Sequence, residues 1–188
     1  MKRTFIIFLC LLLCGSLIFG AEVKAKKIRI QLNGTLLMPA DGNYKDVYGS
    51  SVFYPGIEAG FSLSENFFIW LGYGYLSKSG TTPALEEEAS STQNILTLGG
   101  GYQGDFSEKL GFRIQAGILY ISYKEEALGE EVSDSAIGFN LQGSIVMNFS
   151  DAIFGLVFLG YDYASDDVEG VSIKLGGFKA GLGIGICF

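Results

Sequence analysis

The chain has 188 residues, with 20 acidic and 13 basic side chains, no histidine, 27 glycines and 48% apolar residues. This apolar content excludes a disordered chain, and the acidic balance makes nucleic acid an unfavourable partner. Because histidine is the commonest general base and a frequent metal ligand, its absence argues against Ser–His triads, His-type zinc sites and His-dependent lipid hydrolases.

The first segment has the pattern of a leader sequence. Residues 1–3 are Met-Lys-Arg, residues 4–19 are almost entirely apolar, and the small residues Gly20 and Ala21 follow. We expect a secretory signal peptide over residues 1–21 and a mature domain over residues 22–188. An uncleaved membrane anchor is the alternative, but the run is short for a bilayer span.

After the leader, apolar residues recur at every second position in eight segments, which is typical of strands whose two faces meet different surroundings. The segment 152–163 is apolar on both faces, and an inward Asp162 sets its phase. In chain order, the predicted apolar faces are Ile28, Ile30 and Leu32; Ile57, Ala59, Phe61 and Leu63; Phe67, Ile69, Leu71, Tyr73 and Tyr75; Leu96, Leu98 and Tyr102; Leu110, Phe112, Ile114, Ala116, Ile118 and Tyr120; Ile137, Phe139, Leu141, Ile145 and Met147; Val157, Leu159, Tyr161 and Tyr163; and Phe178, Ala180, Leu182, Ile184, Ile186 and Phe188.

Short and long connections alternate between these strands. Ser, Asn, Asp and Glu predict tight turns at three places, and polar stretches predict four long loops. This alternation predicts an all-β fold, an eight-stranded antiparallel up-and-down transmembrane β-barrel with both ends of the mature chain on the short-turn side. The turns are expected at residues 64–66, 105–108 and 148–151, and the loops at residues 39–51, 77–93, 124–135 and 164–172.

The second face of each strand favours lipid, rather than water, around the barrel. It carries mostly Gly, Ser, Thr, Asn and Gln, which are too small and uncharged for a solvated exterior but suit a narrow lumen. A soluble lipocalin-like barrel or sandwich, with its apolar face inside, is the alternative.

The aromatic residues support the same arrangement, because two aromatic bands are expected of a membrane-spanning barrel. Tyrosines gather in or beside the long loops, and phenylalanines gather at the short-turn end. The tyrosines are Tyr44, Tyr48, Tyr54, Tyr73, Tyr75, Tyr120, Tyr123, Tyr161 and Tyr163, and the phenylalanines are Phe61, Phe67, Phe68, Phe106, Phe112, Phe149 and Phe188.

The end of the chain carries a family resemblance. Phe188 follows a run of alternating apolar residues, which resembles the C-terminal signal that the assembly machinery of bacterial outer-membrane proteins recognises. With the strand count, the mature chain resembles the small barrels of the OmpA/OmpX type over nearly its whole length. The resemblance implies the bacterial outer membrane as the location, outer-membrane lipid and the barrel assembly machinery as partners, and a monomer.

Three charges fall on the inward face, and we expect them to form a buried, hydrogen-bonded ion network. They are Glu58, Arg113 and Lys179, with Arg29 or Asp162 as further members. A buried charge needs a partner, and eight strands leave room only for side chains. A structural role is therefore favoured over an ion or proton path.

Acidic residues concentrate in the predicted long loops. The simplest interpretation is solvated loops that repel one another. Divalent cations are the alternative partners, because carboxylates are suitable ligands for Ca²⁺ or Mg²⁺, although no loop has an EF-hand pattern. These acids are Asp41, Asp46, Glu86, Glu87, Glu88, Glu125, Glu126, Glu130, Glu131, Asp134, Asp166, Asp167 and Glu169.

Short motifs elsewhere have structural interpretations. Residues 99–104 match G-x-G-x-x-G, but a tight turn follows where a dinucleotide site needs a helix, so we interpret the glycines as lumen-facing. Asn33 and Asn148 begin glycosylation sequons that we attribute to chance, and Cys187, the only cysteine after the leader, is expected to be a small filler. We assign no catalytic residue, no cofactor and no metal ligand.

These observations favour a structural or surface-interaction role, with acidic extracellular loops as the working surface and a lumen filled by side chains. A narrow pore or carrier for small apolar solutes is the alternative. A lipid-modifying enzyme is a second alternative, which the absence of histidine disfavours.

Overall fold

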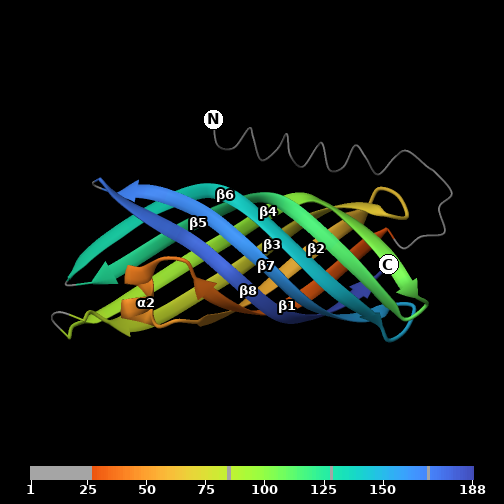
Figure 1. Cartoon of the computed structure of the whole chain (residues 1–188), viewed down its shortest axis with the longest axis horizontal. Helices are drawn as coiled ribbons and strands as arrows, with labels where there is room; N and C mark the ends of the chain where they lie inside the picture. The colour runs from red at the N-terminus through yellow and green to blue at the C-terminus, as the bar shows by residue number, and fades with distance from the viewer. Residues whose placement is uncertain (1–26, 84–85, 128, 169) are drawn as a thin grey trace.

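The computed structural model describes residues 27–83, 86–127, 129–168 and 170–188, and the expected signal peptide lies outside this part of the chain. Eight antiparallel strands form a closed barrel in sequence order, as predicted (Figure 1). No helix among the described residues is long and apolar enough to span a membrane. The elements are β1 (Ile28–Pro39), α2 (Gly42–Tyr48), β2 (Val52–Ser62), β3 (Phe67–Thr81), β4 (Glu88–Ser107), β5 (Leu110–Ala127), β6 (Glu130–Asn148), β7 (Ile153–Val168) and β8 (Val171–Cys187).

The first and last strands close the barrel. β1 pairs with β8 from Arg29 opposite Cys187 to Pro39 opposite Gly177. Beyond the last residue of β8, the Phe188 N–H donates to the Ile28 carbonyl at 2.8 Å. Each unpaired backbone group in hydrocarbon costs several kcal/mol, so this seam is what allows the sheet to exist in lipid.

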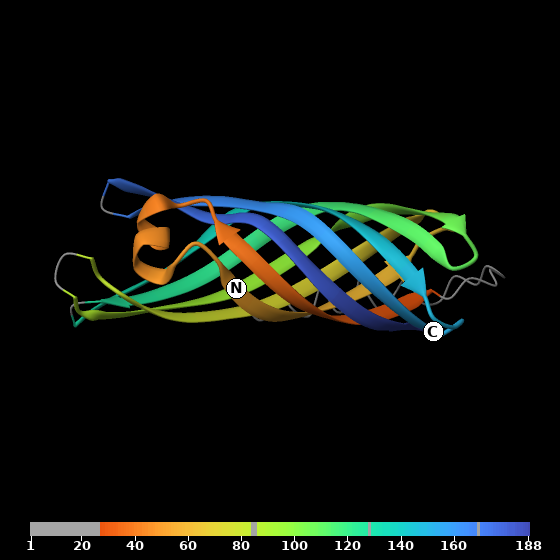
Figure 2. The ribbon, with the colours of Figure 1, turned by 60° about the horizontal axis from the view of Figure 1, so that its bottom comes forward.

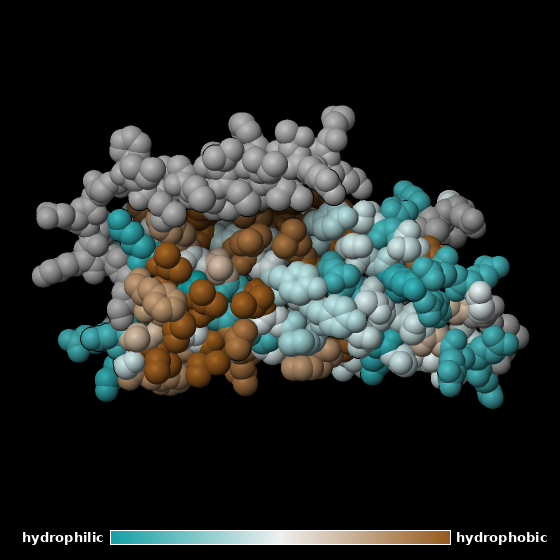
Figure 3. Space-filling view, turned by 180° about the vertical axis from the view of Figure 1, so that it is seen from behind, coloured by the Kyte–Doolittle hydropathy of each residue, from teal (hydrophilic) through white to brown (hydrophobic). Residues whose placement is uncertain are grey.

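The predicted apolar faces point outward, which confirms the predicted orientation of the strands and rules out an apolar face turned inward. Ile137 and Leu159 are 72% and 69% exposed, whereas Asp162 points inward and is 2% exposed. The phase expected for β7 is therefore correct. Figure 3 shows hydrophobic residues gathered over the half nearer the short turns and hydrophilic residues at the opposite end. On β5, the outward apolar run from Leu110 to Tyr120 covers about 25 Å along the barrel axis, the height of a membrane-spanning band.

The aromatic bands are present, but part of the aromatic assignment was wrong. Phe67, Tyr102 and Phe112 contact one another on the outer surface near the short turns, with ring centroids 5.4 and 6.1 Å apart. On the side of the long connections, the outward tyrosines are Tyr73, Tyr75, Tyr120, Tyr161 and Tyr163. Tyr54, Tyr123 and Phe68 instead point into the barrel. Tyr44 and Tyr48 lie in the predicted loop, but they belong to α2 and do not contribute to an outer aromatic band.

Three of the four predicted long loops are mostly strand. β3 and β4 stay paired as far as Thr81 and Glu88, and β5 and β6 as far as Ala127 and Glu130. β7 and β8 likewise pair up to their tips. Beyond the tyrosines most residues on both faces of the sheet are polar or small, so hydropathy stops alternating although the backbone pairing continues. We call the paired ends of β3–β4, β5–β6 and β7–β8, beyond Tyr75, Tyr120 and Tyr163, the outer hairpins.

The short connections lie where the sequence places them, with one shift. Turns join β2 to β3 and β6 to β7 at the predicted positions, whereas β4 continues to Ser107 after an irregularity at Asp105. The connection between β4 and β5 is therefore later than the predicted turn at residues 105–108. Figure 2 shows the C-terminus at this end of the barrel.

The fourth connection, residues 39–51, contains α2 at the end opposite the C-terminus (Figure 2). The Asp41 carboxylate caps the helix, since its Oδ1 accepts the Tyr44 N–H at 3.1 Å, and its Oδ2 accepts the Lys174 N–H of β8 at 3.2 Å. β1 and β2 have only 12 and 11 residues, against 20 for β4. The barrel wall formed by β1 and β2 is therefore shorter at this end, and α2 lies where longer strands would otherwise continue.

An apolar cluster fills the outer part of the lumen, which the sequence analysis missed by treating the inward face as polar. Tyr44 and Tyr48 of α2 lie against this region with ring centroids 4.5 Å apart. The buried residues of the outer cluster are Leu37, Val52, Tyr54, Leu76, Ile95, Leu119, Ile121, Tyr123, Ala136, Ala164 and Leu175.

Adjacent glycines of β4 test how closely the backbones of β4 and β5 approach each other on the inner face. A β-carbon at Gly99 would collide with the Ala116 carbonyl oxygen and with Gly117 across the ladder, whereas at Gly100 the nearest atom would be 3.6 Å away. We expect Gly99→Val to destabilise the barrel by about 1–3 kcal/mol or more, and Gly100→Val to have little effect. Urea unfolding in detergent measures both, and equal losses would contradict the packing described here.

Candidate functional site: buried charges and the outer mouth

The lumen holds a belt of polar side chains below the outer cluster. Five of them are charged and almost completely buried: Arg29, Glu58, Arg113, Asp162 and Lys179. The predicted inward positions of these charges are confirmed. Uncharged polar residues surround them: Gln31, Thr35, Thr97, Gln115, Asn140, Gln142 and Ser144.

Lys179 and Asp162 form the ion pair of this belt. The Lys179 Nζ lies 3.0 Å from the Asp162 Oδ1, on neighbouring strands β8 and β7. Asn140 of β6, directly opposite Asp162 in the ladder, donates its side-chain amide to the same carboxylate. Gly160, opposite Lys179, leaves room for the lysine stem, because a β-carbon there would lie 3.0 Å from its Cε.

Glu58 does not form the direct ion pairs that the sequence suggested. Its Oε2 accepts a hydrogen bond from the Gln115 side chain at 3.0 Å. Arg29, Arg113 and Lys179 are close enough to act on it electrostatically, but none is within ion-pair distance in the described part of the chain. A neutral amide therefore takes the position that the prediction gave to a cation.

The two arginines use aromatic rings and glutamines as partners. The Arg29 guanidinium lies 3.8 Å from the centre of the Phe68 ring and donates to the Gln103 side chain at 3.2 Å. Arg113 lies 4.6 Å from the centre of the Phe154 ring and donates to Gln31 at 3.3 Å. Guanidinium groups suit such sites because their faces are weakly hydrated and their edges carry several donors.

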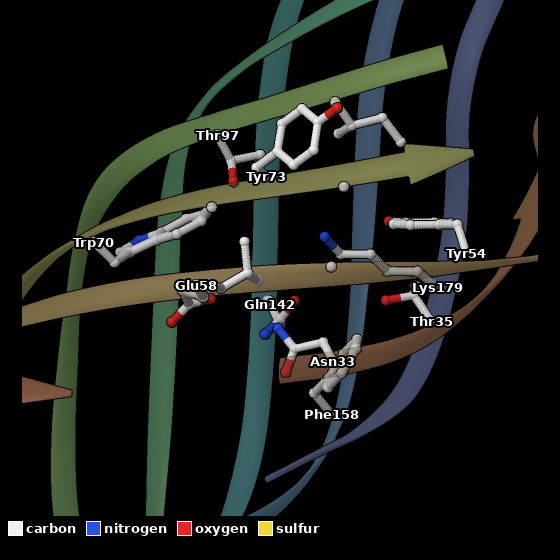
Figure 4. Close-up of a pocket in the computed structure, with 15 residues that line it drawn as sticks. Asn33, Thr35, Tyr54, Glu58, Trp70, Tyr73, Thr97, Gln142, Phe158 and Lys179 are labelled. Carbon is white, nitrogen blue, oxygen red and sulfur yellow. The ribbon is translucent and has the colours of Figure 1, made fainter. Parts of the chain in front are cut away.

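An interior cavity of about 50 Å³ lies within this belt. Figure 4 shows side chains from several strands around it, including Glu58, Trp70, Gln142 and Lys179. Thr35 and Thr97 add hydroxyl groups to its lining. Its volume matches one or a few water molecules, and it is far below the roughly 300 Å³ of a small-molecule site.

A second polar group lies at the outer mouth, beneath α2. The Ser91 hydroxyl donates to the Glu125 Oε1 at 3.5 Å, and the Tyr123 hydroxyl donates to the Asp166 carboxylate at 2.8 Å. Burial raises the pKa of Glu125 above its ordinary value of 4.5, and the nearby negative charge of Asp41 raises it further. The hydrogen bond from Ser91 lowers the pKa of Glu125 and offsets part of this rise, so the net effect is that the carboxyl group ionises less readily than in water.

The remaining predicted motifs have structural places. Residues 99–104 lie entirely within β4, which leads through a turn into β5, so no helix follows the glycines. Gly99 and Gly101 face the lumen, as interpreted, whereas Gly100 faces outward. Asn33 lies inside β1, and Cys187 is a half-buried free thiol at the end of β8.

The acids of the outer hairpins are spread along the strands. Among the described residues, no group of three or more Asp, Glu, His or Cys side chains is arranged to hold a metal ion. Lys124 of β5 pairs with Glu126 on the same strand at 2.5 Å and with Glu131 of β6 at 3.1 Å. These exposed pairs are worth little individually.

The Lys179–Asp162 pair gives a first prediction for this site. Lys179→Met or Asp162→Leu leaves one buried charge without its partner, and each should destabilise the barrel by about 3–5 kcal/mol. The double variant should recover much of that loss, because both charges are gone. Urea unfolding of the two single variants and the double variant measures the coupling. Lys174→Met, at an exposed position of β8, is the control, and strictly additive losses would refute the pairing.

Glu125 gives a second prediction. Because its pKa is raised in the folded protein, its contribution to stability is complete below pH 4.5 and is lost as the pH rises through the folded-state pKa. Glu125→Gln should remove this part of the pH dependence and stabilise the barrel at neutral pH. Urea unfolding midpoints of the wild type and Glu125→Gln, compared between about pH 4.5 and 8, measure this change in pH dependence. Glu130→Gln, on the same hairpin but exposed, should keep the wild-type slope, and a Glu125→Gln protein with that slope would disprove the assignment.

Comparison with known proteins agrees with this architecture. No protein-family model matches the chain, and no curated protein is similar to it in sequence. Among solved structures, the chain is similar to the outer membrane protein OprG of Pseudomonas aeruginosa, with a TM-score of 0.66 and 12% identity over 88% of this chain and 97% of that one.

Two further structures share the fold. The N-terminal β-barrel domain of Pseudomonas aeruginosa OprF has a TM-score of 0.56 and 16% identity, over 87% of this chain and 98% of that one. The Yersinia pestis attachment invasion locus protein, Ail, solved with the heparin analogue sucrose octasulfate, has a TM-score of 0.51 and 10% identity, over 86% and 97%. By fold, the chain is a closed eight-stranded antiparallel β-barrel similar to these small outer-membrane barrels.

Proposed function

We propose that this protein is a monomeric outer-membrane barrel with a structural and surface-interaction role, and that its acidic outer hairpins are the working surface. The lipid-facing belt supports residence in the membrane. The filled lumen carries the proposal, because it leaves the outer surface, rather than a passage, as the place where the chain meets other molecules.

The filling of the lumen argues against transport. The outer cluster and α2 occupy the mouth, and the polar belt below them surrounds a cavity of about 50 Å³. Hydrated ions and small apolar solutes need more room than one or a few water molecules. This argues against the alternative function, a narrow pore or carrier, which conductance and uptake measurements test.

The charge of the outer hairpins indicates the kind of partner. The β5–β6 hairpin carries Glu125, Glu126, Glu130, Glu131 and Asp134, against Lys124 as its one basic residue among those described. Such a surface attracts cationic segments and repels polyanions. Ail was solved with a sulfated, negatively charged ligand. The acidic hairpins of this chain instead favour a positively charged partner.

Two further partners follow from position. The exposed Phe188 at the seam supports recognition by the barrel assembly machinery, and the apolar belt supports contact with outer-membrane lipid. We propose that divalent cations meet the acidic hairpins as diffuse counterions, since no ligand cluster is present among the described residues.

A reconstituted preparation tests the proposal. In planar bilayers we expect no conductance steps, and in vesicles no uptake of small apolar solutes. A lipid-modifying activity would appear as products from phospholipid or lipopolysaccharide, and we expect none. Conductance steps or solute uptake would favour the pore, and lipid products would favour the enzyme.

Binding of a polylysine peptide to the outer surface tests the hairpins. We expect binding at 0.05 M salt that falls by about tenfold or more at 0.5 M, because salt screens exposed charges. The triple change Glu126→Gln, Glu130→Gln and Glu131→Gln should weaken it similarly. Glu65→Gln with Glu108→Gln, at the short-turn end, is the control. Equal binding by both variants would count against the hairpins as the working surface.

A further inference from the structure

Two residues that line the interior cavity each have a buried polar atom with no hydrogen-bond partner among the described protein groups. These atoms are the Oε1 of Glu58 and the Nε1 of Trp70. Leaving a buried donor or acceptor unpaired costs about 1–3 kcal/mol, and more for a charged group. Two such atoms on residues that line one cavity indicate a ligand that satisfies both.

The third polar group at the cavity is the Lys179 ammonium. An ammonium group has three N–H donors, and the ion pair with Asp162 uses one of them, so two donors remain for other partners. Lys179, Glu58 and Trp70 come from β8, β2 and β3, so their side chains approach the cavity from different parts of the wall (Figure 4).

We infer that the cavity binds a small cluster of water molecules that joins Glu58 to Lys179. The ligand must donate to a carboxylate oxygen and accept from an indole N–H and an ammonium. A metal cation accepts no hydrogen bond, and a simple anion donates none, whereas water does both. The cavity has the volume for one or a few waters and more than two polar partners for them.

The water cluster gives Glu58 the connection to a cation that the sequence predicted. Glu58 is held directly by Gln115 and, through water, by the Lys179 ammonium, so the interior charges form one hydrated network. This site adds an internal ligand to the barrel and does not depend on what the outer hairpins bind.

The only tryptophan of the chain lies at this cavity, which provides a selective probe. In lipid vesicles, water-edited solid-state NMR should show rapid magnetisation transfer from water to the Trp70 indole N–H and to the Lys179 ammonium. Glu58→Leu should reduce the transfer to Trp70 by severalfold, and Glu58→Gln, which keeps an acceptor, should restore it. Gln93→Leu is the control, since Gln93 is also buried with an unpartnered oxygen but does not line the cavity.

Each outcome decides the inference. Transfer that is absent in the wild type, or unchanged in Glu58→Leu, would overturn it. Exchange of Na⁺ for K⁺ or Li⁺ should leave the Trp70 and Lys179 signals in place, and a clear shift would identify a bound cation instead of water. If Glu58→Leu fails to fold, Thr97→Val provides a second variant, because it removes a hydroxyl of the lining while keeping the charges and the side-chain shape.

Discussion

The structure depends on closure of the sheet in a solvent that offers no hydrogen bonds. Each backbone N–H and C=O at membrane depth needs a partner in the chain, and the seam between β1 and β8 provides the last of them. Closing only eight strands makes the cylinder narrow, so its own side chains fill it. The chemistry of the interior follows from this narrowness, because charges that bulk water would solvate in a wider barrel here use glutamines, aromatic rings and one another.

Alternation was sufficient to predict the strands because lipid and the packed lumen impose opposite demands on neighbouring residues. The same alternation places Glu58, Arg113 and Lys179 inside, and Asp162 sets the phase of β7. It fails beyond the tyrosines, where polar residues such as Ser91 are also found on the inner face and hydropathy no longer distinguishes the two faces. Phe68 was misplaced although the signal existed, since its neighbours Phe67 and Ile69 point outward.

The partners of the buried charges could not be predicted in the same way. Which side chains meet across the lumen depends on the stagger and tilt of the whole barrel, and no local pattern encodes these. Lys179 therefore pairs with Asp162 on the next strand, and Glu58 meets Gln115 from the opposite wall. The outer cluster was missed for a related reason, because hydropathy does not separate an aliphatic side chain that fills the lumen from one that faces lipid. α2 lies in a stretch that reads only as polar loop.

The length of the outer hairpins sets how far the acidic tips stand from the membrane. From Tyr120, at the edge of the apolar belt, to Ala127 at the end of β5, a strand tilted by about 40° rises roughly 18 Å. The polar headgroup layer on one side of a bilayer is only about 5–8 Å thick. The tips thus extend beyond this layer, and a bulky molecule can contact them without displacing lipid.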